Sequence, residues 1–341
     1  MSPINIHRRR AAVAPLATTT WSPTFKGTNI ALSGGNLVTS ASAAGHMVYS
    51  TDWKSGGKYR FEVTIGGTGS GLAHQIGVMT CHGSGTAFPS LAPAAMHDDR
   101  YGAYVTGDTG NIYLGGNPGS FGNIGSFGAG ATIAVEIDTS AGTIQFCKSG
   151  GTFTAPITIP AGKYYCPVLL VNNTTNILTA NFGASPWAIP ASPGYGPWTK
   201  NASPSFGRYW RFCCVTGYQG FAIAEAAMKT VAGGANVIGG GTASASSTYT
   251  TLVPAQAIDG NPATIWGANS SNGNGEWWMY DFAAGNSKAN IQAQLQSRND
   301  FDQYATQLLI MGSQNNADWF PAFGTTGLAW ARGETKTFTW G

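Results

Sequence analysis

The sequence predicts an all-β protein built from short antiparallel strands, and three observations support this fold class. Several segments alternate apolar and polar residues, glycine is abundant at 48 of 341 residues, and no apolar run approaches a membrane span. Each glycine inside a helix costs about 1 kcal/mol relative to alanine, so this composition disfavours long helices. With 43% hydrophobic residues the chain can still form cores, and its length suggests two domains or one large β unit.

The first 20 residues form a basic segment that contains Arg8, Arg9 and Arg10. The alanine-rich stretch behind the arginines is short and is interrupted by Pro15, so it is a poor match to a secretion signal. We expect residues 1–20 to be an arm that docks on an assembly partner through these arginines. The alternative is a peptide that lies on its own domain.

Alternating strands follow from about residue 21. In the segment KYRFEVTI, Tyr59, Phe61, Val63 and Ile65 share one face, which we expect to be buried. Lys58, Arg60, Glu62 and Thr64 share the opposite face, which we expect to be exposed to solvent. The segment TIAVEIDTSAGTIQF predicts a hairpin with a turn at Ser-Ala-Gly, with Glu136 and Asp138 on its outer face. Period-two burial with closely spaced turns is typical of an antiparallel sandwich.

The order of these segments resembles that of a SPRY domain over about residues 20–195. The resemblance depends on DWKSGGKYRFEVTI, IGVMT, YGAYVTGDTGNIY, GATIAVEIDTSAGTIQFCKSGG, GKYYCPVLLV and LTANFGASPW, in that order. It implies a bent β-sandwich over residues 21–190 that presents loops for recognition and carries no catalytic centre.

A proline-rich segment, residues 191–205, predicts a linker, and a second strand pattern occupies residues 206–341. The motifs IDGNPATIW and LLIMGSQNNADWF resemble a discoidin-type domain, which is the jelly roll of coagulation-factor modules and of many carbohydrate-binding modules. The strand pair RYWRF…IAEAAM resembles the pair that normally closes such a domain, yet here it comes first. We therefore predict a circularly permuted jelly roll, in which the strand near 208–215 pairs close to the one near 335–340. The alternative is a missing last strand that a neighbouring chain supplies.

Charge restricts the partners that the chain can bind. Charged residues make up 10% of the sequence, and without the three arginines of the arm 15 basic residues balance 15 acidic ones. A neutral body argues against nucleic-acid binding and favours an uncharged partner or a packed, multi-copy assembly. The absence of a long apolar run likewise argues against membrane insertion.

The five cysteines cannot all form disulfides with one another. Cys213 and Cys214 are adjacent in an apolar run, so on a strand they point to opposite faces. We interpret all five as small buried hydrophobic residues, which indicates folding in a reducing cytoplasm.

Standard catalytic motifs are absent from the sequence, and we expect no enzyme activity. The cluster His97, Asp98, Asp99 and Arg100 is interpreted as a solvated turn in preference to a metal or acid–base site. Asp300 and Asp302 have the residue types of a glycosidase pair. Because Arg298 and Asn299 precede them, a loop with internal salt bridges is the favoured interpretation.

The discoidin resemblance implies a structural Ca²⁺ bound by Glu225, Asp259, Asn261 and Thr264, since the DGN…T loop wraps such an ion in these modules. Calcium prefers six to eight oxygen ligands, which carboxylates and turn carbonyls supply. The alternative is a plain turn in which Asp259 caps its own backbone. No other cofactor is expected.

A carbohydrate site would depend on aromatic rings, which stack on sugars, and on amide and guanidinium groups, which bind hydroxyls. The polar loop GANSSNGNGEW, together with the loop that follows residue 297, predicts a shallow cleft. Its candidate residues are Asn272, Asn274, Trp277, Arg298 and Asn299. Trp278, Tyr280 and Phe282 alternate on one face and are assigned to the core, as is Trp266. The alternative is an ordinary polar surface.

The two modules in tandem resemble bacteriophage tail or fibre-associated virion proteins. This resemblance implies a non-enzymatic virion protein that is assembled in the host cytoplasm, docks on other virion proteins through its N-terminal region and binds a host surface polysaccharide or receptor. Weak sites repeated on one particle would then reach useful avidity. The alternatives are a decoration or connector protein that binds no sugar, a depolymerase and a secreted bacterial adhesin.

Overall fold

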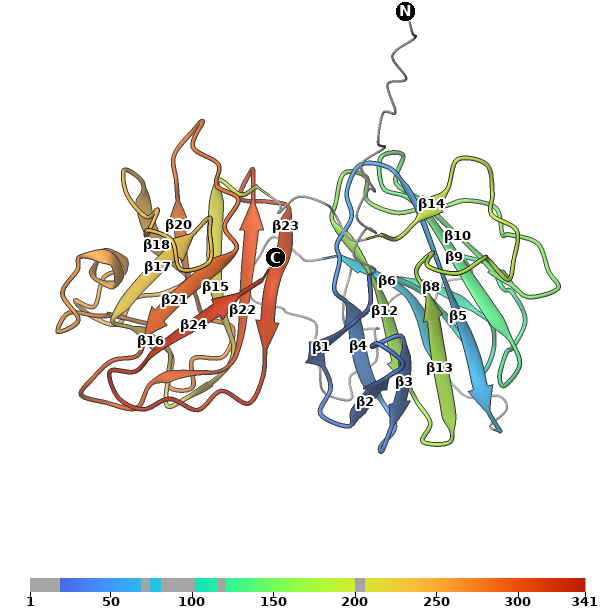
Figure 1. The fold of residues 1–341 in the computed structure, drawn as a ribbon, viewed down its shortest axis with the longest axis horizontal. Helices are drawn as coiled ribbons and strands as arrows, with labels where there is room; N and C mark the ends of the chain where they lie inside the picture. The colour runs from blue at the N-terminus through green and yellow to red at the C-terminus, as the bar shows by residue number, and fades with distance from the viewer. Residues whose placement is uncertain (1–18, 69–73, 81–101, 116–120, 200–205, 341) are drawn as a thin grey trace, which may run out of the picture.

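The computed structural model describes residues 19–68, 74–80, 102–115, 121–199 and 206–340. It consists of two β-units that lie side by side, as Figure 1 shows. These ranges contain the short 3₁₀ helix η2 (Pro254–Ile258). None of the described helical segments has the length and hydropathy needed to cross a membrane. The predicted all-β fold class is therefore confirmed.

The N-terminal unit is a sandwich of two sheets. The six-stranded sheet has the order β1 (Trp21–Lys26), β4 (His46–Ser50), β12 (Tyr165–Val171), β6 (Gln75–Thr80), β7 (Ala103–Thr106) and β8 (Ile112–Leu114). The other sheet has the order β11 (Ile157–Thr158), β10 (Thr143–Lys148), β9 (Thr132–Asp138), β5 (Lys58–Gly67), β13 (Asn176–Asn181), β3 (Val38–Ala41) and β2 (Ile30–Ser33), and β14 (Gly196–Pro197) pairs in parallel with β5. The predicted inner residues Phe61, Val63 and Ile65 are fully buried between the two sheets.

The middle of the predicted outer face of β5 and β9 is buried as well, which corrects the sequence prediction for Arg60, Glu62 and Glu136. Lys58 and Thr64, at the two ends of this face, are exposed as predicted. Arg60, Glu62 and Glu136 are at most 2% exposed. Arg60 Nη1 donates to Glu136 at 2.7 Å, and the backbone N–H groups of Ile189 and Ser192 donate to the two glutamates at 3.0 and 2.9 Å. The chain after β13 therefore covers this face and satisfies the carboxylates that the alternation assigned to solvent.

The first part of the predicted linker, up to Trp198, belongs to the N-terminal unit. Trp198 is fully buried in the core of the first unit, and its indole N–H donates to the Asp52 carbonyl at 3.1 Å. Together with the pairing of β14, this contact places the chain up to Trp198 in the first unit. Residues 200–205 lie outside the described residues.

The C-terminal unit has two main sheets. The five-stranded sheet has the order β18 (Thr242–Ala245), β20 (Trp277–Asp281), β15 (Tyr209–Tyr218), β22 (Tyr304–Ser313) and β23 (Trp319–Thr325). The three-stranded sheet has the order β17 (Glu225–Lys229), β21 (Gln292–Gln296) and β24 (Thr335–Thr339), and β16 (Ala222–Ile223) pairs with β19 (Trp266–Gly267). Trp266, Trp278, Tyr280 and Phe282 are buried in the core of this unit, as predicted.

The predicted pairing of the strand near 208–215 with the strand near 335–340 is wrong. The first of these is β15, which pairs with β20 and β22, whereas β24 pairs with β21 in the other sheet. The two strands meet through their side chains, because the rings of Trp210 and Trp340 lie 5.8 Å apart. It is β17 that shares a sheet with β24, on the opposite side of β21.

A third apolar cluster joins the two units. The outer face of the six-stranded sheet contributes Phe25, Met47, Tyr49, Met79, Tyr104, Cys166, Val168 and Leu170, and the outer face of the five-stranded sheet contributes Cys213, Met279, Leu309, Met311 and Trp319. Cys214 points into the core of its own unit, which confirms that the adjacent cysteines face opposite ways. The four described cysteines are buried, and Cys81 lies outside the described residues. Lys163 and Asp318 form an ion pair between the units.

Candidate functional site

One end of the C-terminal unit collects loops from distant parts of the sequence. Gly217 N–H donates to Asn274 Oδ1 at 2.8 Å, and the Gln303 amide donates to the Gln219 carbonyl at 3.0 Å. These bonds join the ends of strands that the sequence separates widely. We call this region the loop-end surface, and it comprises residues 217–221, 270–276, 297–304 and 330–334.

Arg298 holds the loop-end surface together. Its Nε and Nη2 donate to the two carboxylate oxygens of Asp300 at 2.7 and 2.8 Å, and its Nη1 donates to Gln303 Oε1 at 2.6 Å. Its carbonyl accepts from Gly333 N–H at 3.0 Å. The sequence offered Arg298 as a donor to sugar hydroxyls, but the structure commits its guanidinium to protein partners. Arg298 is therefore a positioning residue of this surface.

The carboxylates next to Arg298 are bound in ion pairs, as predicted. Asp300 is held by Arg298, and the hydrogen bond from that guanidinium lowers the pKa of the Asp300 carboxyl. Asp302 is bound by Arg332 at 2.9 and 3.1 Å, and this hydrogen bond likewise lowers the pKa of Asp302. Two carboxylates held in the charged form by separate arginines do not have the acid and base roles that a glycosidase pair needs.

The three predicted asparagines lie on the exposed part of this end. Asn272 Oδ1 accepts from Asn274 N–H at 3.0 Å and from Ser270 Oγ at 3.1 Å, which shapes the loop before β20. Asn299 is exposed beside Gly333. The structure thus brings Asn272, Asn274 and Asn299 to one end of the unit, together with Arg298.

Trp277 does not take part in this surface as the sequence suggested. Its ring centroid lies 4.2 Å from Arg211 Cζ, on the face of the sheet that packs against the N-terminal unit. The strand alternation explains this orientation: Trp278 points into the core, so Trp277 must point to the outer face. The proposed role of Trp277 in stacking on a sugar is therefore corrected.

Three other aromatic residues occupy the loop-end surface and were missed by the sequence analysis. Tyr218 and Tyr304 are paired across β15 and β22, with rings stacked at 5.3 Å and 17°. Tyr218 is 45% exposed and Phe301 is 46% exposed. In the sequence, the only indication that Tyr218 and Phe301 are exposed is that they stand beside turn residues, in TGYQG and RNDFD. Exposed, rigid aromatic rings of this kind are common anchors in binding sites.

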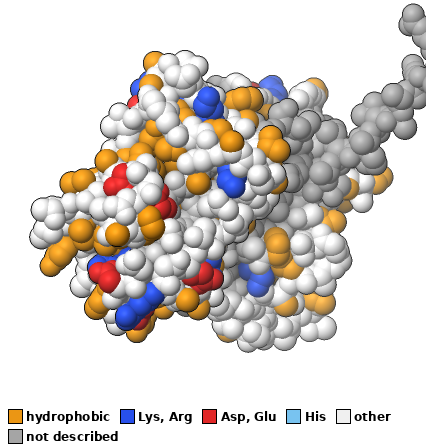
Figure 2. Space-filling model, turned by 60° about the vertical axis from the view of Figure 1, so that its left-hand side comes forward, with side chains coloured by type: hydrophobic (Ala, Val, Ile, Leu, Met, Phe, Trp, Pro, Cys, Tyr) orange, Lys and Arg blue, Asp and Glu red, His pale blue; other side chains and the backbone are white. Residues whose placement is uncertain are grey.

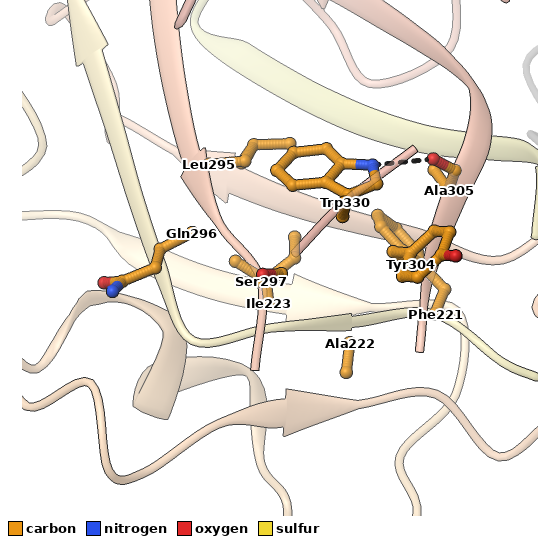
Figure 3. Close-up of a pocket in the computed structure, with 9 residues that line it drawn as sticks. All are labelled: Phe221, Ala222, Ile223, Leu295, Gln296, Ser297, Tyr304, Ala305 and Trp330. Carbon is orange, nitrogen blue, oxygen red and sulfur yellow. Dashed lines mark hydrogen bonds between the residues drawn. The ribbon is translucent and has the colours of Figure 1, made fainter. Parts of the chain in front are cut away.

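A shallow pocket lies beside these rings (Figure 3). Tyr304 and Trp330 both line it, and the Trp330 indole N–H donates to the Ala305 carbonyl at 2.9 Å. Its volume is about 240 Å³ including open solvent. The space that the centre of a water molecule can occupy in it is about 10 Å³, which is room for about one water molecule. The pocket can therefore accept a small apolar group, whereas a sugar ring would have to lie across its rim. The remaining lining residues are Phe221, Ala222, Ile223, Leu295, Gln296, Ser297 and Ala305.

The predicted calcium residues form a second cluster, at the start of β17 and after η2. Asp259 accepts from Asn261 N–H at 2.9 Å and from Thr264 Oγ1 at 2.7 Å, which is the self-capped turn of the alternative interpretation. Glu225 lies next to Asp259. Burial, and then the charge of Asp259, raise the pKa of the Glu225 carboxyl, while the N–H groups of Asn261 and Gly260 partly oppose this shift.

One atom of this cluster indicates that a cation fits. Glu225 Oε1 is enclosed and has no hydrogen-bond partner within the described part of the chain. Two neighbouring carboxylates and several turn oxygens form the hard oxygen set that calcium prefers. Among the described residues, no three His, Cys, Asp or Glu side chains lie close enough together to hold a metal ion. The remaining calcium ligands would therefore be amide, hydroxyl and carbonyl oxygens.

Two further predictions lie outside the described residues. These are the docking arm with Arg8, Arg9 and Arg10, and the cluster His97, Asp98, Asp99 and Arg100.

Comparison with known families agrees with the two units. Residues 58–185 match the SPRY domain, and residues 241–340 match the F5/8 type C domain, which is the discoidin type. Two successive parts of the chain are therefore similar to a SPRY domain and to a discoidin-type domain, in that order. Strand β15 precedes the second match, although it forms the middle of the five-stranded sheet.

Solved structures similar to part of this chain include the following three. The SPRY domain of human HERC1 has 18% identity and a TM-score of 0.38, covering 49% of this chain and 99% of that chain. The TRIM65 PSpry domain has 12% identity and a TM-score of 0.38, covering 48% of this chain and 89% of that chain. Stonustoxin has 14% identity and a TM-score of 0.34, covering 48% of this chain and 27% of that chain. None of the curated proteins matches the chain.

Proposed function

We propose that this chain is a non-catalytic recognition protein that binds glycan through the loop-end surface of its discoidin-type domain. SPRY and discoidin-type domains are in general protein-interaction or carbohydrate-binding modules. The observation that carries the proposal is the aromatic group of exposed Tyr218 and Phe301 and half-buried Tyr304, which stands beside amide side chains and a small apolar pocket. Sugar rings stack on such aromatic faces and bond to such amides.

The charge distribution supports an uncharged or weakly charged glycan. The two arginines of the loop-end surface are bound by Asp300 and Asp302, and the surface also contains Glu276 and Glu334, so it has no excess of positive charge. Figure 2 shows few charged side chains, of both signs, scattered over the face that it presents. A strongly anionic polymer would find no concentrated positive field there.

The test is binding of the full chain to an array of bacterial surface polysaccharides. Tyr218→Ala is expected to weaken binding about tenfold, which corresponds to about 1.4 kcal/mol. Tyr249→Ala is the matched control, because Tyr249 is also exposed, at 54%, but lies outside the loop-end surface. If both variants bind glycan equally well, the glycan site lies elsewhere. If the wild type binds no glycan, the connector or decoration protein becomes the favoured function.

We also propose that the two oxygen-rich turns around Glu225 and Asp259 hold a structural Ca²⁺. The ion would neutralise the two neighbouring carboxylates and fix the turn after η2. Support comes from the enclosed, unpartnered Glu225 Oε1 and from the raised pKa of that carboxyl.

The placement of the protein in a bacteriophage virion is part of the same proposal. Its support is the sequence resemblance and the low charge, and its test is mass spectrometry of purified particles. The chain should be present in stoichiometric, multi-copy amounts, and deletion of residues 1–20 should remove it from the particle. A secreted adhesin would instead be found in culture medium with a processed N-terminus.

A further inference from the structure

Arg211 lies in the contact between the two domains, on the outer face of β15. It is 3% exposed. Its Cζ lies 4.2 Å from the ring centroid of Trp277 and 4.0 Å from that of Trp319. Because these tryptophans come from β20 and β23, on opposite sides of β15, the guanidinium is held between two indoles.

The donors at this point have no acceptor. Arg211 Nε, Arg211 Nη1 and Trp319 Nε1 are enclosed and have no hydrogen-bond partner within the described ranges. Buried donors without partners are rare in folded proteins, and each one needs an explanation such as a bound water or ion. Three of them in one place, one side chain being a cation, indicate a missing acceptor.

The described neighbours do not supply the missing negative charge. The titratable group that acts on Arg211 is the Cys213 thiol, and burial raises its pKa to about 12, so it is neutral. Asp318, next to Trp319, is bound by Lys163 and by Asn315 Nδ2 at 2.8 Å. Burial lowers the pKa of Arg211, but a guanidinium stays charged in proteins. A buried and uncompensated charge is strongly unfavourable.

We propose that a small inorganic anion, a halide, binds to Arg211 and Trp319 in the contact between the two domains. Water also accepts hydrogen bonds from these donors, but it leaves the charge uncompensated. The apolar side chains around the site, among them Met279 and Met311, favour a weakly hydrated ion over phosphate or sulfate. The anion would stabilise the docked arrangement of the domains, and this inference is independent of the proposed glycan site.

The test is thermal melting of the full chain in sodium bromide or chloride against sodium gluconate at equal ionic strength. The wild type is expected to melt at higher temperature in halide, because an ion that binds only the folded state stabilises it. Arg211→Met should lose this halide-specific shift. In gluconate it should melt at or above the wild type, because the variant removes the uncompensated charge.

Arg208→Met is the matched control, since Arg208 is bound by Asp281 at 2.7 Å and should not contact the anion. If Arg211→Met does not fold, Trp319→Phe keeps an aromatic ring, removes one donor and should reduce the shift. Crystals soaked in bromide should give an anomalous peak within hydrogen-bond distance of Arg211. No halide-specific shift in the wild type, an equal shift in Arg211→Met, or bromide peaks only elsewhere (an adventitious ion only) would overturn the proposal.

Discussion

Phe25 of the N-terminal unit lies directly against Gly324 of the C-terminal unit. A Cβ atom at position 324 would lie 2.5 Å from Phe25 Cδ2, well inside van der Waals contact. Gly324 stands on β23 and Phe25 on β1, the edge strands of the two sheets that face each other (Figure 1). The absence of a side chain at 324 is therefore what allows the two edges to approach.

Replacing Gly324 by valine is expected to separate the domains. The added methyl groups cannot enter the space that the Phe25 ring occupies, and overpacking of this kind costs about 1–3 kcal/mol. The variant should show a lower melting temperature and a larger radius of gyration by small-angle X-ray scattering.

The control for this variant is Gly239→Ala, because a Cβ at position 239 has nothing within 4 Å. If Gly324→Val keeps the radius of gyration of the wild type, the docking of the two domains is not limited by this contact.

The domain contact was not predicted, although the sequence contains a signal for it. Strand β12 reads YCPVLLV and β22 contains LLIM, and both are continuous apolar runs where an exposed sheet face would alternate. Such runs are typical of strands that are buried on both faces. The outward residues Val168, Leu170, Leu309 and Met311 do pack in the contact. Sequence alone could not say which two faces meet, because that depends on the path of the chain between the domains.

The buried ionic cluster around Arg60 in the N-terminal unit could not be predicted from the sequence. The alternation in β5 correctly predicted its inner face, but a two-residue period cannot reveal that residues 186–192 fold back over the other face. Arg60 lies 4.8 Å from the ring centroid of Trp187 and is bonded by Glu62 and Glu136. Only the tertiary structure turns these surface-like residues into core residues.

Arg60→Met is therefore expected to destabilise the protein by about 3–5 kcal/mol, because it leaves two buried glutamates without their counter-charge. Denaturation in urea measures this change. Adding Glu62→Gln and Glu136→Gln to Arg60→Met should recover part of the stability, since the uncompensated charges are then removed.

The exposed pair Arg208 and Asp281 provides a comparison, because both of its side chains are partly solvated, at 30% and 24%. Arg208→Met should cost only about 0–1 kcal/mol. A similar cost for Arg60→Met would show that the cluster is not desolvated in solution.

The sequence predicted where the loop-end surface lies, but not which hydrogen bonds its side chains make. The sequence correctly brought Arg298 and Asn299 to the same end as Asn272 and Asn274, because loops of a jelly roll gather at its ends. It could not predict that Asp300 and Gln303 occupy the guanidinium, since that depends on the conformation of one turn.

Arg298→Ala should reduce glycan binding indirectly, by releasing Gln303 and the loop that carries Phe301. Arg298→Lys should lose most of the same affinity, because a lysine cannot make the paired bonds to Asp300 together with the bond to Gln303. The measurement is glycan binding beside the melting temperature. An arginine that contacted the glycan directly by its charge would instead be largely replaced by lysine.

Glu225→Gln is expected to have opposite effects with and without calcium. Without the ion, burial and the neighbouring Asp259 raise the pKa of Glu225 above its value in the unfolded chain. The folded state then binds more protons than the unfolded state between these two pKa values, so this residue contributes increasing stability as the pH falls through that window. At neutral pH the charged Glu225 carboxylate destabilises the folded state. Glu225→Gln should therefore raise the melting temperature of the chelator-treated protein.

In millimolar calcium the order should reverse. The wild type gains stability because the ion binds only the folded state, and the variant lacks one of the two carboxylates and should gain little. Glu334→Gln serves as the control, since Glu334 is bound by Lys336 and by the N–H of Ala331, away from this turn. Melting curves of the three proteins in calcium and in chelator decide the matter. An identical wild-type curve in both conditions would leave Asp259 as the cap of its own turn, with no ion beside it.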